Sequence, residues 1–315
     1  MTLHRSSGQW QMGLGLSLLT VFLWGILPIA LTLVLQVLDV YTLTWFRFLV
    51  SFGLLALYLA ARRQLPDLRK LSAGFLKLLA IATLFLALNY LLYLQGLVQT
   101  SPATAQVVIQ LAPVLMGLGA LGIFKERYTR SQWVGLGVLS LGMVLFFHEQ
   151  LRTLVGAPTR YLGGSGLLVL GAAAWAVYAL AQKQLLQKIS SPEIMLAIYG
   201  GAALLFTPTI SPQPMFTLNP LQSGMLLFCA LNTLVAYGAF AEALDHWDAS
   251  RVSAVLSLTP LVTIASTIPA SFLWPALFTL KQLTFLSLVG AVLVVSGSFA
   301  IALGKQPPSI EVSKS

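Results

Sequence analysis

The chain has few charged residues and almost no cysteine. Of its 315 residues, 9% are Asp, Glu, Lys or Arg and 57% are hydrophobic, and the mean hydropathy is +0.86. Soluble domains contain about 25% charged residues, so a soluble fold of this size could not cover its surface. The one cysteine, Cys229, excludes an intramolecular disulfide and a cysteine-based metal cluster. The composition predicts an integral membrane protein.

Histidine and acidic residues are absent from the middle of the apolar segments. The three histidines, His4, His148 and His246, fall in the N-terminal tail or in predicted loops. A proton relay inside a membrane needs a buried carboxylate or histidine, and the sequence therefore leaves proton-coupled and passive transport equally open. We expect no metal site, no cofactor and no catalytic residues.

One acidic cluster lies at the predicted inner end of the eighth span, and it consists of Glu242, Asp245, His246 and Asp248. A membrane-embedded enzyme would need acid–base or metal-binding groups near the bilayer surface, and these four side chains could bind a cation. Their spacing also suits capping of the turn before the next span, which we favour. The protein is accordingly not expected to be an enzyme.

Ten apolar runs are long enough to cross a membrane, which takes roughly 20 residues. The first is too long for the roughly 7–15-residue apolar core of a signal peptide. A proline-rich stretch at 208–220 is expected to run extended outside the bilayer. The ten predicted spans are 12–35, 42–61, 74–98, 102–124, 131–147, 163–185, 193–210, 222–244, 249–273 and 282–303.

The basic residues predict the orientation, because cytoplasmic loops are enriched in Lys and Arg. With the N-terminus inside, fourteen of the 18 basic residues lie on the inner side, and only Arg152, Arg160 and Lys281 lie outside. Both termini, including a short C-terminal tail, are thus predicted to be cytoplasmic in a bacterial-type inner membrane. The net charge of +9 then belongs to cytoplasmic loops, and no nucleic-acid partner is expected.

Arg47 is the one basic residue well inside a predicted span. At 1.5 Å per residue it lies roughly 8 Å from the outer end of span 42–61. That depth is shallow enough for a long side chain to reach the interface. We expect Arg47 to anchor the fold.

Sequence landmarks recur in the same order in both halves of the chain. Because each half has five spans, an odd number, the second half enters the membrane from the opposite side. We therefore predict an all-α polytopic membrane protein of two inverted five-helix repeats, residues 1–155 and 156–315. In transporters such repeats enclose a binding site near the bilayer midplane. The matched pairs are Trp24 with Trp175, Asn89 with Asn232, Pro113 with Pro260, Gly135 with Gly290, and Gly142 with Gly297.

The order and spacing of several motifs resemble a known family. The motifs are Trp24-Gly25, Arg47-Phe48, Pro113, and Lys125-Glu126-Arg127 followed by Gln132, Trp133, Gly135 and Gly142. Together they are similar to the drug/metabolite transporter superfamily, in its EamA-like branch. The resemblance implies ten spans and transport, with amino acids or related metabolites as exported solutes. Leu273-Trp274-Pro275 replaces the charged turn in the second half, and we expect Glu126 to pair with Lys125 or Arg127 in a solvated contact.

Polar and aromatic residues inside the spans are the candidate substrate-binding residues. One helical face of the fourth span carries Gln106, Gln110 and Pro113, and the ninth span repeats this pattern with Ser253, Ser257 and Pro260. Aromatic walls with a few amides suit a small amphipathic solute. The alternative is that the polar side chains form hydrogen bonds between helices and the aromatic ones fill gaps in helix packing. The predicted binding residues are Trp24, Asn89, Tyr93, Gln106, Gln110, Trp175, Tyr178, Asn232, Tyr237, Ser253 and Ser257, with Pro113, Pro260 and Arg47 as hinge or structural positions.

These features predict a secondary transporter. The leading hypothesis is an exporter of small organic metabolites, such as amino acids, which alternates access around a cavity between the repeats. A passive facilitator or uniporter of a nucleotide- or drug-like solute is the alternative, and a membrane-embedded enzyme is a remote one. The expected partners are the solute and the lipid bilayer. The glycine-rich segments 135–142 and 290–297 permit close helix approach, within a monomer as we favour or in a weak homodimer.

Overall fold

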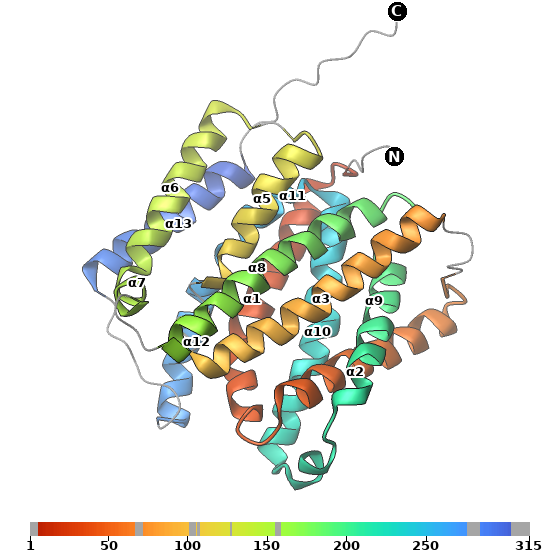
Figure 1. Ribbon diagram of the computed structural model, residues 1–315. Coiled ribbons are helices and arrows are strands. Elements are labelled where there is room, and N and C mark those ends of the chain that lie inside the picture. Colours follow the sequence, from red (N-terminus) through yellow and green to blue (C-terminus); the bar gives the residue numbers. More distant parts are fainter. Residues whose placement is uncertain are drawn as a thin grey trace, which may run out of the picture.

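The computed structural model describes residues 6–66, 72–100, 105, 108–126, 128–154, 159–275 and 284–303. Within these ranges every regular element is a helix, which confirms the all-α prediction. Figure 1 shows the helices as one bundle. The long helices are α1 (Trp10–Val34), α2 (Val40–Ala61), α3 (Ala73–Gln99), α5 (Leu111–Ile123), α6 (Arg130–Phe146), α8 (Thr159–Leu185), α9 (Ser191–Phe206), α10 (Pro220–His246), α12 (Thr259–Leu273) and α13 (Phe285–Ala302), and the short ones are α7 (His148–Leu154) and α11 (Ala249–Leu256).

The helices coincide with the predicted spans. Seven helical stretches of the described chain, counting α11 and α12 as one, are long and apolar enough to cross a membrane. The helices α5 and α6 are shorter but apolar. The prediction for segment 208–220 is wrong, because it contains 3₁₀ turns at Thr207–Thr209 and Gln213–Thr217 instead of extended chain. Proline is tolerated in a first helical turn, where its missing N–H would have no partner anyway.

Several helices begin at side-chain caps. Capping boxes start α6 at Thr129 with Gln132, α9 at Ser190 with Glu193, and α10 at Asn219 with Gln222. Such caps satisfy the backbone N–H groups that the first turn leaves without partners. They also fix where each helix starts, and therefore which of its residues lie at mid-bundle.

The helices pair across the two halves of the sequence. α1 packs against α10 and α3 against α8, while α2 packs against α9 and α6 against α13. Each span has a counterpart at the same place in the other half of the chain. The counterparts of α1 and α10 are α8 and α3, so the α1–α10 pair corresponds to the α8–α3 pair. The α1–α12 pair corresponds in the same way to α8–α5, and these two helices also pack together. Figure 1 shows α7 at the end of the bundle opposite to the start of α1 and the end of α13. We refer to these as the α7 end and the termini end.

Glycines join α6 to α13 within the monomer. A Cβ added at Gly142 would lie 2.6 Å from the backbone nitrogen of Val294, and one added at Gly290 would lie 2.3 Å from that of Phe146. Because both obstacles are backbone atoms, they cannot move aside as a side chain could. The glycine-rich segments therefore form an intramolecular packing surface, as favoured above.

The glycine contact can be tested with two positions on α6. Gly142→Ala should lower the melting temperature in detergent, since overpacking a tight contact costs about 1–3 kcal/mol. Gly137→Ala is the matched control, because an added Cβ there meets nothing within 4 Å. Circular dichroism melts should show a loss for the first variant only. Equal melting temperatures would contradict a tight α6–α13 contact.

Candidate functional site

A cavity of about 110 Å³ lies at mid-bundle and extends toward the α7 end. It is enclosed by helices from both halves of the chain. Its aromatic and charged lining residues are Trp24, Arg47, Tyr90, Tyr93, Trp175 and Tyr237. The other lining residues are Leu27, Pro28, Leu31, Asn89, Leu94, Ile109, Gln110, Ala112, Pro113, Leu256 and Thr259.

Two helix breaks border this cavity at corresponding places. Helix α5 begins directly after Gln110, and α11 ends before Ser257, with α12 resuming at Thr259. Because proline lacks an N–H, Pro113 and Pro260 free the carbonyls four residues earlier, at Ile109 and Leu256, and both of these residues line the cavity. The break in each span is therefore the structural effect of the predicted prolines.

The two breaks differ in how the freed carbonyl is satisfied. The hydroxyl of Thr259 donates to the Leu256 carbonyl at 2.6 Å. Ala112 occupies the corresponding position of the first half and has no donor to offer. The carbonyl of Ile109, at the border of the cavity, therefore has no counterpart of the hydroxyl that Thr259 supplies to Leu256.

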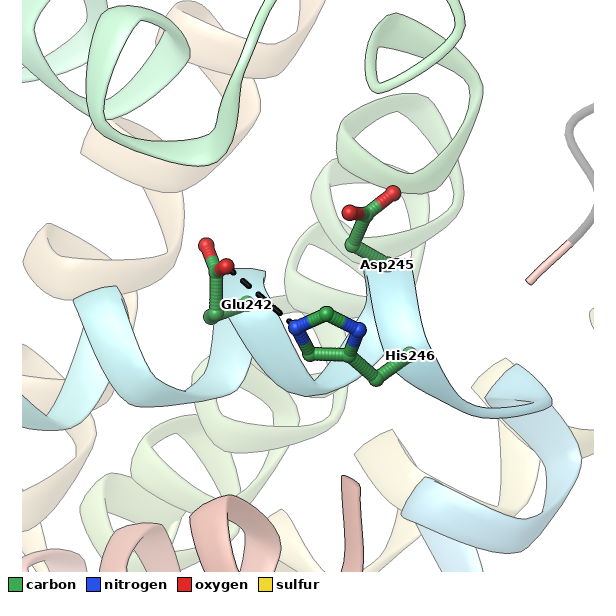
Figure 2. Close-up of side chains that lie close together, drawn as sticks. All are labelled: Glu242, Asp245 and His246. Carbon is green, nitrogen blue, oxygen red and sulfur yellow. Dashed lines mark ion pairs between the residues drawn. The ribbon is translucent and has the colours of Figure 1, made fainter. Parts of the chain in front are cut away.

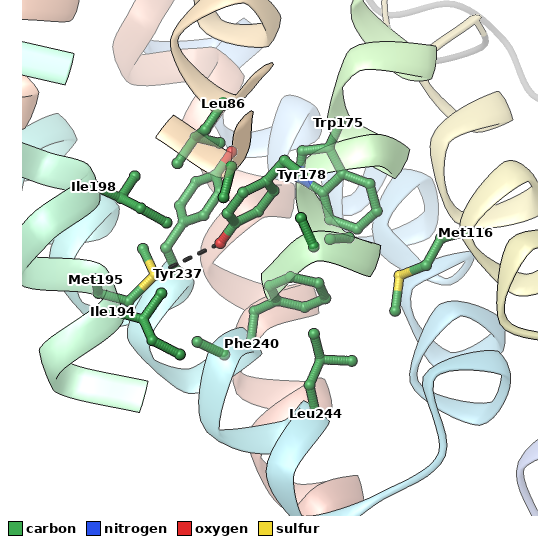
Figure 3. Packing of buried hydrophobic residues seen from close by; sticks show 14 of the residues in the cluster. Leu86, Met116, Trp175, Tyr178, Ile194, Met195, Ile198, Tyr237, Phe240 and Leu244 are labelled. Atoms are coloured by element: carbon green, nitrogen blue, oxygen red, sulfur yellow. Dashed lines mark hydrogen bonds between the residues drawn. The ribbon is translucent and has the colours of Figure 1, made fainter. Parts of the chain in front are cut away.

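Aromatic rings from three helices form one wall. The ring centroid of Trp24 lies 5.7 Å from that of Trp175 and 4.9 Å from that of Tyr237. Tyr178 does not line the cavity, contrary to its predicted role. It lies one turn beyond Trp175, fully buried against Phe240, and its hydroxyl donates to the sulfur of Met195 (Figure 3). These packed rings close the bundle between the cavity and the termini end.

Two buried polar atoms in the lining have no hydrogen-bond partner among the described residues. They are the indole Nε1 of Trp24, a donor, and the Oε1 of Gln110, an acceptor. A buried polar group without a partner costs about 1–3 kcal/mol. A bound solute that offers one acceptor and one donor would remove both costs. Gln106, the other predicted glutamine, lies outside the described residues.

The two asparagines differ in their placement. Asn89 lines the cavity while its Nδ2 donates to the Gly171 carbonyl at 2.9 Å. Asn232 does not line it, because its Nδ2 reaches the Leu23 carbonyl at 2.6 Å on the neighbouring helix. Each amide thus satisfies a backbone carbonyl on a neighbouring helix, as the alternative of hydrogen bonding between helices predicts. Only Asn89 also lines the cavity.

The two serines of the ninth span do not line the main cavity. Ser253 and Ser257 border a separate space of about 20 Å³. Their hydroxyls donate within their own segment, to the carbonyls of Ser250 at 2.8 Å and Ser253 at 3.2 Å. Pro260 likewise lies outside the main lining. The ninth span contributes Leu256 and Thr259 to the cavity instead.

Arg47 does not reach the interface, although its depth along the span would allow that. Its side chain is 3% exposed and lines the cavity. The Nε donates to the hydroxyl of Thr233 at 2.9 Å, the Nη2 donates to the hydroxyl of Tyr90 at 3.4 Å, and the guanidinium carbon lies 4.5 Å from the Tyr90 ring centroid. Span 42–61 faces the bundle interior at this position, so the side chain extends inward rather than along the helix to water.

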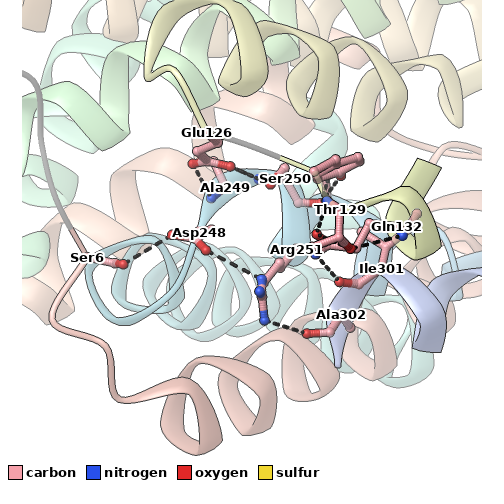
Figure 4. A network of polar contacts seen from close by, with 12 residues as sticks. Ser6, Glu126, Thr129, Gln132, Asp248, Ala249, Ser250, Arg251, Ile301 and Ala302 are labelled. Atoms are coloured by element: carbon pink, nitrogen blue, oxygen red, sulfur yellow. Dashed lines mark hydrogen bonds and ion pairs between the residues drawn. The ribbon is translucent and has the colours of Figure 1, made fainter. Parts of the chain in front are cut away.

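A polar network closes the termini end (Figure 4). Glu126 pairs with Lys183 at 2.7 Å, not with its sequence neighbour Lys125, and Arg127 lies outside the described residues. Both side chains are largely buried, at 11% and 2% exposure. Glu126 also accepts the backbone N–H groups of Ala249 and Ser250 at 3.0 Å each and the hydroxyl of Ser250. A carboxylate from the first half therefore caps α11 of the second.

Three further bonds extend this network to α13 and α6. Arg251 donates to the Ala302 carbonyl at 3.1 Å and pairs with Asp248 at 3.4 Å. Gln132 donates to the Ile301 carbonyl at 3.0 Å. The network thus joins the start of α6, the start of α11 and the end of α13 at one end of the bundle.

Burial alone would raise the pKa of Glu126, but the charge of Lys183 and the hydrogen bonds from Lys183 and Ser250 outweigh it. The pKa of Glu126 therefore lies below its ordinary value of 4.5. The carboxylate is charged at neutral pH, and the ion pair is intact there.

An acidic cluster lies at the end of α10, and Figure 2 shows its residues Glu242, Asp245 and His246 close together. Glu242, Asp245 and His246 bring potential ligand atoms within 4.8 Å of one another. However, His246 contacts the hydroxyl of Ser7 at 2.8 Å and pairs with Glu242 at 3.4 Å, and the Asp245 carbonyl accepts the Ser7 N–H. The cluster's contacts therefore hold the N-terminal segment at the end of α10, and the capping role favoured above is wrong, because Glu126 caps α11 instead.

Several residues in or beside the cavity lining were missed from the sequence. Tyr90 and Thr233 hold Arg47, and each adjoins a predicted asparagine, Asn89 or Asn232. The run Ala87–Leu94, ALNYLLYL, contained this signal, because a tyrosine beside a buried polar residue needs a partner for its hydroxyl. Leu27, Leu31 and Leu94 are ordinary apolar residues and gave no such signal.

Comparison with known proteins gives consistent matches along the chain. The sequence model of the EamA-like transporter family matches twice, at residues 11–148 and 162–303. An uncharacterized transporter of Haemophilus influenzae is 37% identical over 93% of this chain and 95% of its own length. The uncharacterized inner membrane transporter YhbE of Escherichia coli K12 is 38% identical over 93% and 92%.

Two more distant matches cover similar lengths. A probable amino-acid metabolite efflux pump of Salmonella typhimurium is 26% identical over 92% of this chain and 94% of its own. A protein of known crystal structure superposes with a TM-score of 0.69 over 92% of this chain and 97% of that chain. It is 17% identical, which shows a shared fold.

The Glu126–Lys183 pair predicts a stability that depends on pH in one direction. A lowered carboxylate pKa gives stabilisation that is complete above the ordinary value of 4.5 and is lost as pH falls below it. Glu126→Gln should therefore lower the melting temperature at pH 7, since breaking a buried pair costs about 3–5 kcal/mol. The gap from wild type should stay constant from about pH 8 to 5 and narrow at more acidic pH.

The double variant Glu126→Gln, Lys183→Met provides the control. Removing the unpaired ammonium should recover part of the lost stability, as a coupled pair requires. Additive losses in the double variant would show that the two side chains do not interact.

Proposed function

The chain belongs to the EamA-like transporter family, and from this premise we propose that it exports small organic metabolites by alternating access to its central cavity. The observation that carries the proposal is the cavity itself. It lies between helices of both halves, and two of its lining residues, Trp24 and Gln110, carry a buried donor and a buried acceptor that have no partner among the described residues.

The two ends of the bundle differ, because the cavity extends toward one end and packed side chains close the other. This difference supports alternating access. The cavity extends toward the α7 end, whereas packed aromatic rings and the Glu126 network close the termini end. We propose that this arrangement is the outward-facing state, with both termini cytoplasmic in the inner membrane. The relative YhbE carries the inner membrane in its name, and the excess of Lys and Arg at the termini end agrees with it.

Two inverted repeats, 1–155 and 156–315, are the proposed moving units. The family model matches once within each, and the helix pairs exchange as a pseudo-twofold axis would require. In such transporters the halves rock around a site at their interface, often beside broken helices. The breaks after Gln110 and at Ser257 occupy these positions.

The size of the cavity favours a small solute. An apolar cavity of about 150 Å³ holds benzene, whereas drug-sized ligands occupy pockets of roughly 300–1,000 Å³. At about 110 Å³ this cavity is closer to the first class. A relative named a probable amino-acid metabolite efflux pump agrees with a substrate of amino-acid size. Size thus favours a metabolite over a nucleotide- or drug-like solute.

Transport should depend on the amide of Gln110. In proteoliposomes assayed by counterflow with a panel of amino acids, Gln110→Leu should reduce the rate for the transported solute by about 10-fold or more, since a lost hydrogen bond to a charged group is worth about 1.5–3 kcal/mol. Absence of saturable flux for every solute in wild-type protein would overturn the proposal.

Gln182 provides a matched control. It is fully buried and both of its amide atoms lack described partners, yet it lies outside the cavity lining. Gln182→Leu should therefore keep wild-type flux and raise the melting temperature, because an unsatisfied amide is replaced by an apolar side chain. Equal loss of flux in both variants would show that the effect is not specific to the cavity.

A further inference from the structure

Arg47 places a positive charge in the lining of the cavity. It projects from α2, is 3% exposed, and lies among the rings of Tyr90, Tyr93 and Tyr237. A charged side chain inside a membrane protein normally pairs with an opposite charge or with backbone carbonyls. The contacts of Arg47 are of a different kind.

Both hydrogen-bond partners of Arg47 are neutral hydroxyls, those of Thr233 and Tyr90. No ion pair joins it to a carboxylate in the described ranges, and the nearest carboxylate along its own helix, Asp39, caps the first turn of α2. Throughout the sequence, moreover, the acidic residues lie at span ends, in loops or in the tail. Among the described residues, this charge therefore has no internal counter-ion at mid-membrane.

The neutral contacts fix the orientation of the guanidinium. The hydroxyl of Thr233 accepts from Nε and itself donates to the Cys229 carbonyl at 2.9 Å. The face of the guanidinium lies over the Tyr90 ring at 4.5 Å. These contacts use two of its five N–H donors. The remaining donors are held in place beside the cavity, in a geometry suited to a carboxylate.

A purely structural role does not explain the charge. A neutral donor such as glutamine could bond to Thr233 without the cost of burying an unpaired ion, which is several kcal/mol in a low-dielectric interior. The free-energy cost of burying this charge is offset only when an anionic group binds beside the guanidinium. The cavity leaves room beside Arg47 for that group.

We propose that Arg47 binds the carboxylate of the transported solute, an inference that rests on the proposed transport function. The free acceptor Oε1 of Gln110 suits an ammonium group, and the wall formed by Trp24, Trp175 and Tyr237 suits an apolar side chain. The site thus takes small amino acids or carboxylic acids with an apolar side chain. Amines that lack a carboxylate are excluded, because their charge would be repelled by the guanidinium.

Matched solutes test the carboxylate directly. Thermal shift of the detergent-purified protein would compare L-phenylalanine, 3-phenylpropanoate, which lacks the amine, and 2-phenylethylamine, which lacks the carboxylate. The same set is repeated with L-leucine, 4-methylpentanoate and isopentylamine. The solutes with a carboxylate should stabilise the wild type, and the amines should not. Equal stabilisation by an amine and its parent amino acid would overturn the proposal, as would stabilisation by inorganic phosphate but by none of the carboxylates.

Substitutions at Arg47 of α2 and at Arg62, which caps the end of α2, locate the effect. Arg47→Gln should weaken binding of the carboxylate solutes by about 30-fold or more, as expected when one partner of a buried charge pair is removed. Arg47→Lys should retain part of the binding. Arg62→Gln is the matched control, because Arg62 also stacks on a tyrosine of α2 but is exposed at the helix end. Unchanged carboxylate binding by Arg47→Gln would contradict the assignment.

The two proposals fail in distinguishable ways. If Arg47→Gln does not fold, the comparison of solutes on wild-type protein decides the matter alone. If wild-type proteoliposomes transport no solute, the transport function fails, whatever Arg47 binds. If they transport 2-phenylethylamine as fast as L-phenylalanine, transport stands and the role of Arg47 is wrong.

Discussion

Hydrogen bonding without water is the constraint on which the structure depends. In the bilayer interior each polar group must find a partner in the protein. Most hydroxyls meet this demand by bonding back to a carbonyl four residues earlier, as Ser17, Thr44 and Thr83 do. The asparagines meet it across helix pairs, at Gly171 and Leu23. Against this background the few groups left without partners are conspicuous, and those of Trp24 and Gln110 border one cavity.

The sequence predicted the helices well because apolar length is a direct consequence of membrane thickness. It also predicted the prolines that interrupt two spans, since loss of an N–H is a local property. Trp24, Asn89, Tyr93, Gln110, Trp175 and Tyr237 all line the cavity. Two signals together identified these residues as candidates for the lining. Each is polar or aromatic within a span, and each has a counterpart in the other half.

The remaining errors concern the direction in which a side chain points and the residue with which it pairs. Both depend on how the helices pack together. Depth along a helix gave no hint that Arg47 points inward, because that is decided by how α2 is rotated against α3 and α10. Glu126 was assigned to its sequence neighbours, yet its partner Lys183 is supplied by α8 and the N–H groups it caps by α11. Tyr178 packs against Phe240 one turn beyond Trp175, and Asn232 bonds to the Leu23 carbonyl, so neither lines the cavity. Contacts between distant segments cannot be read from spacing alone.

The charged turn at Glu126 has no equivalent in the second half, where Leu273, Trp274 and Pro275 occupy the corresponding place. Leu273 and its neighbour Phe272 are exposed side chains with no polar group to form a lock. In the proposed carrier, the Glu126 turn is held by charge, whereas the described residues of the second turn offer an apolar contact. Salt and acidity would then act on the first contact, whereas cooling, which weakens hydrophobic contact, would act on the second.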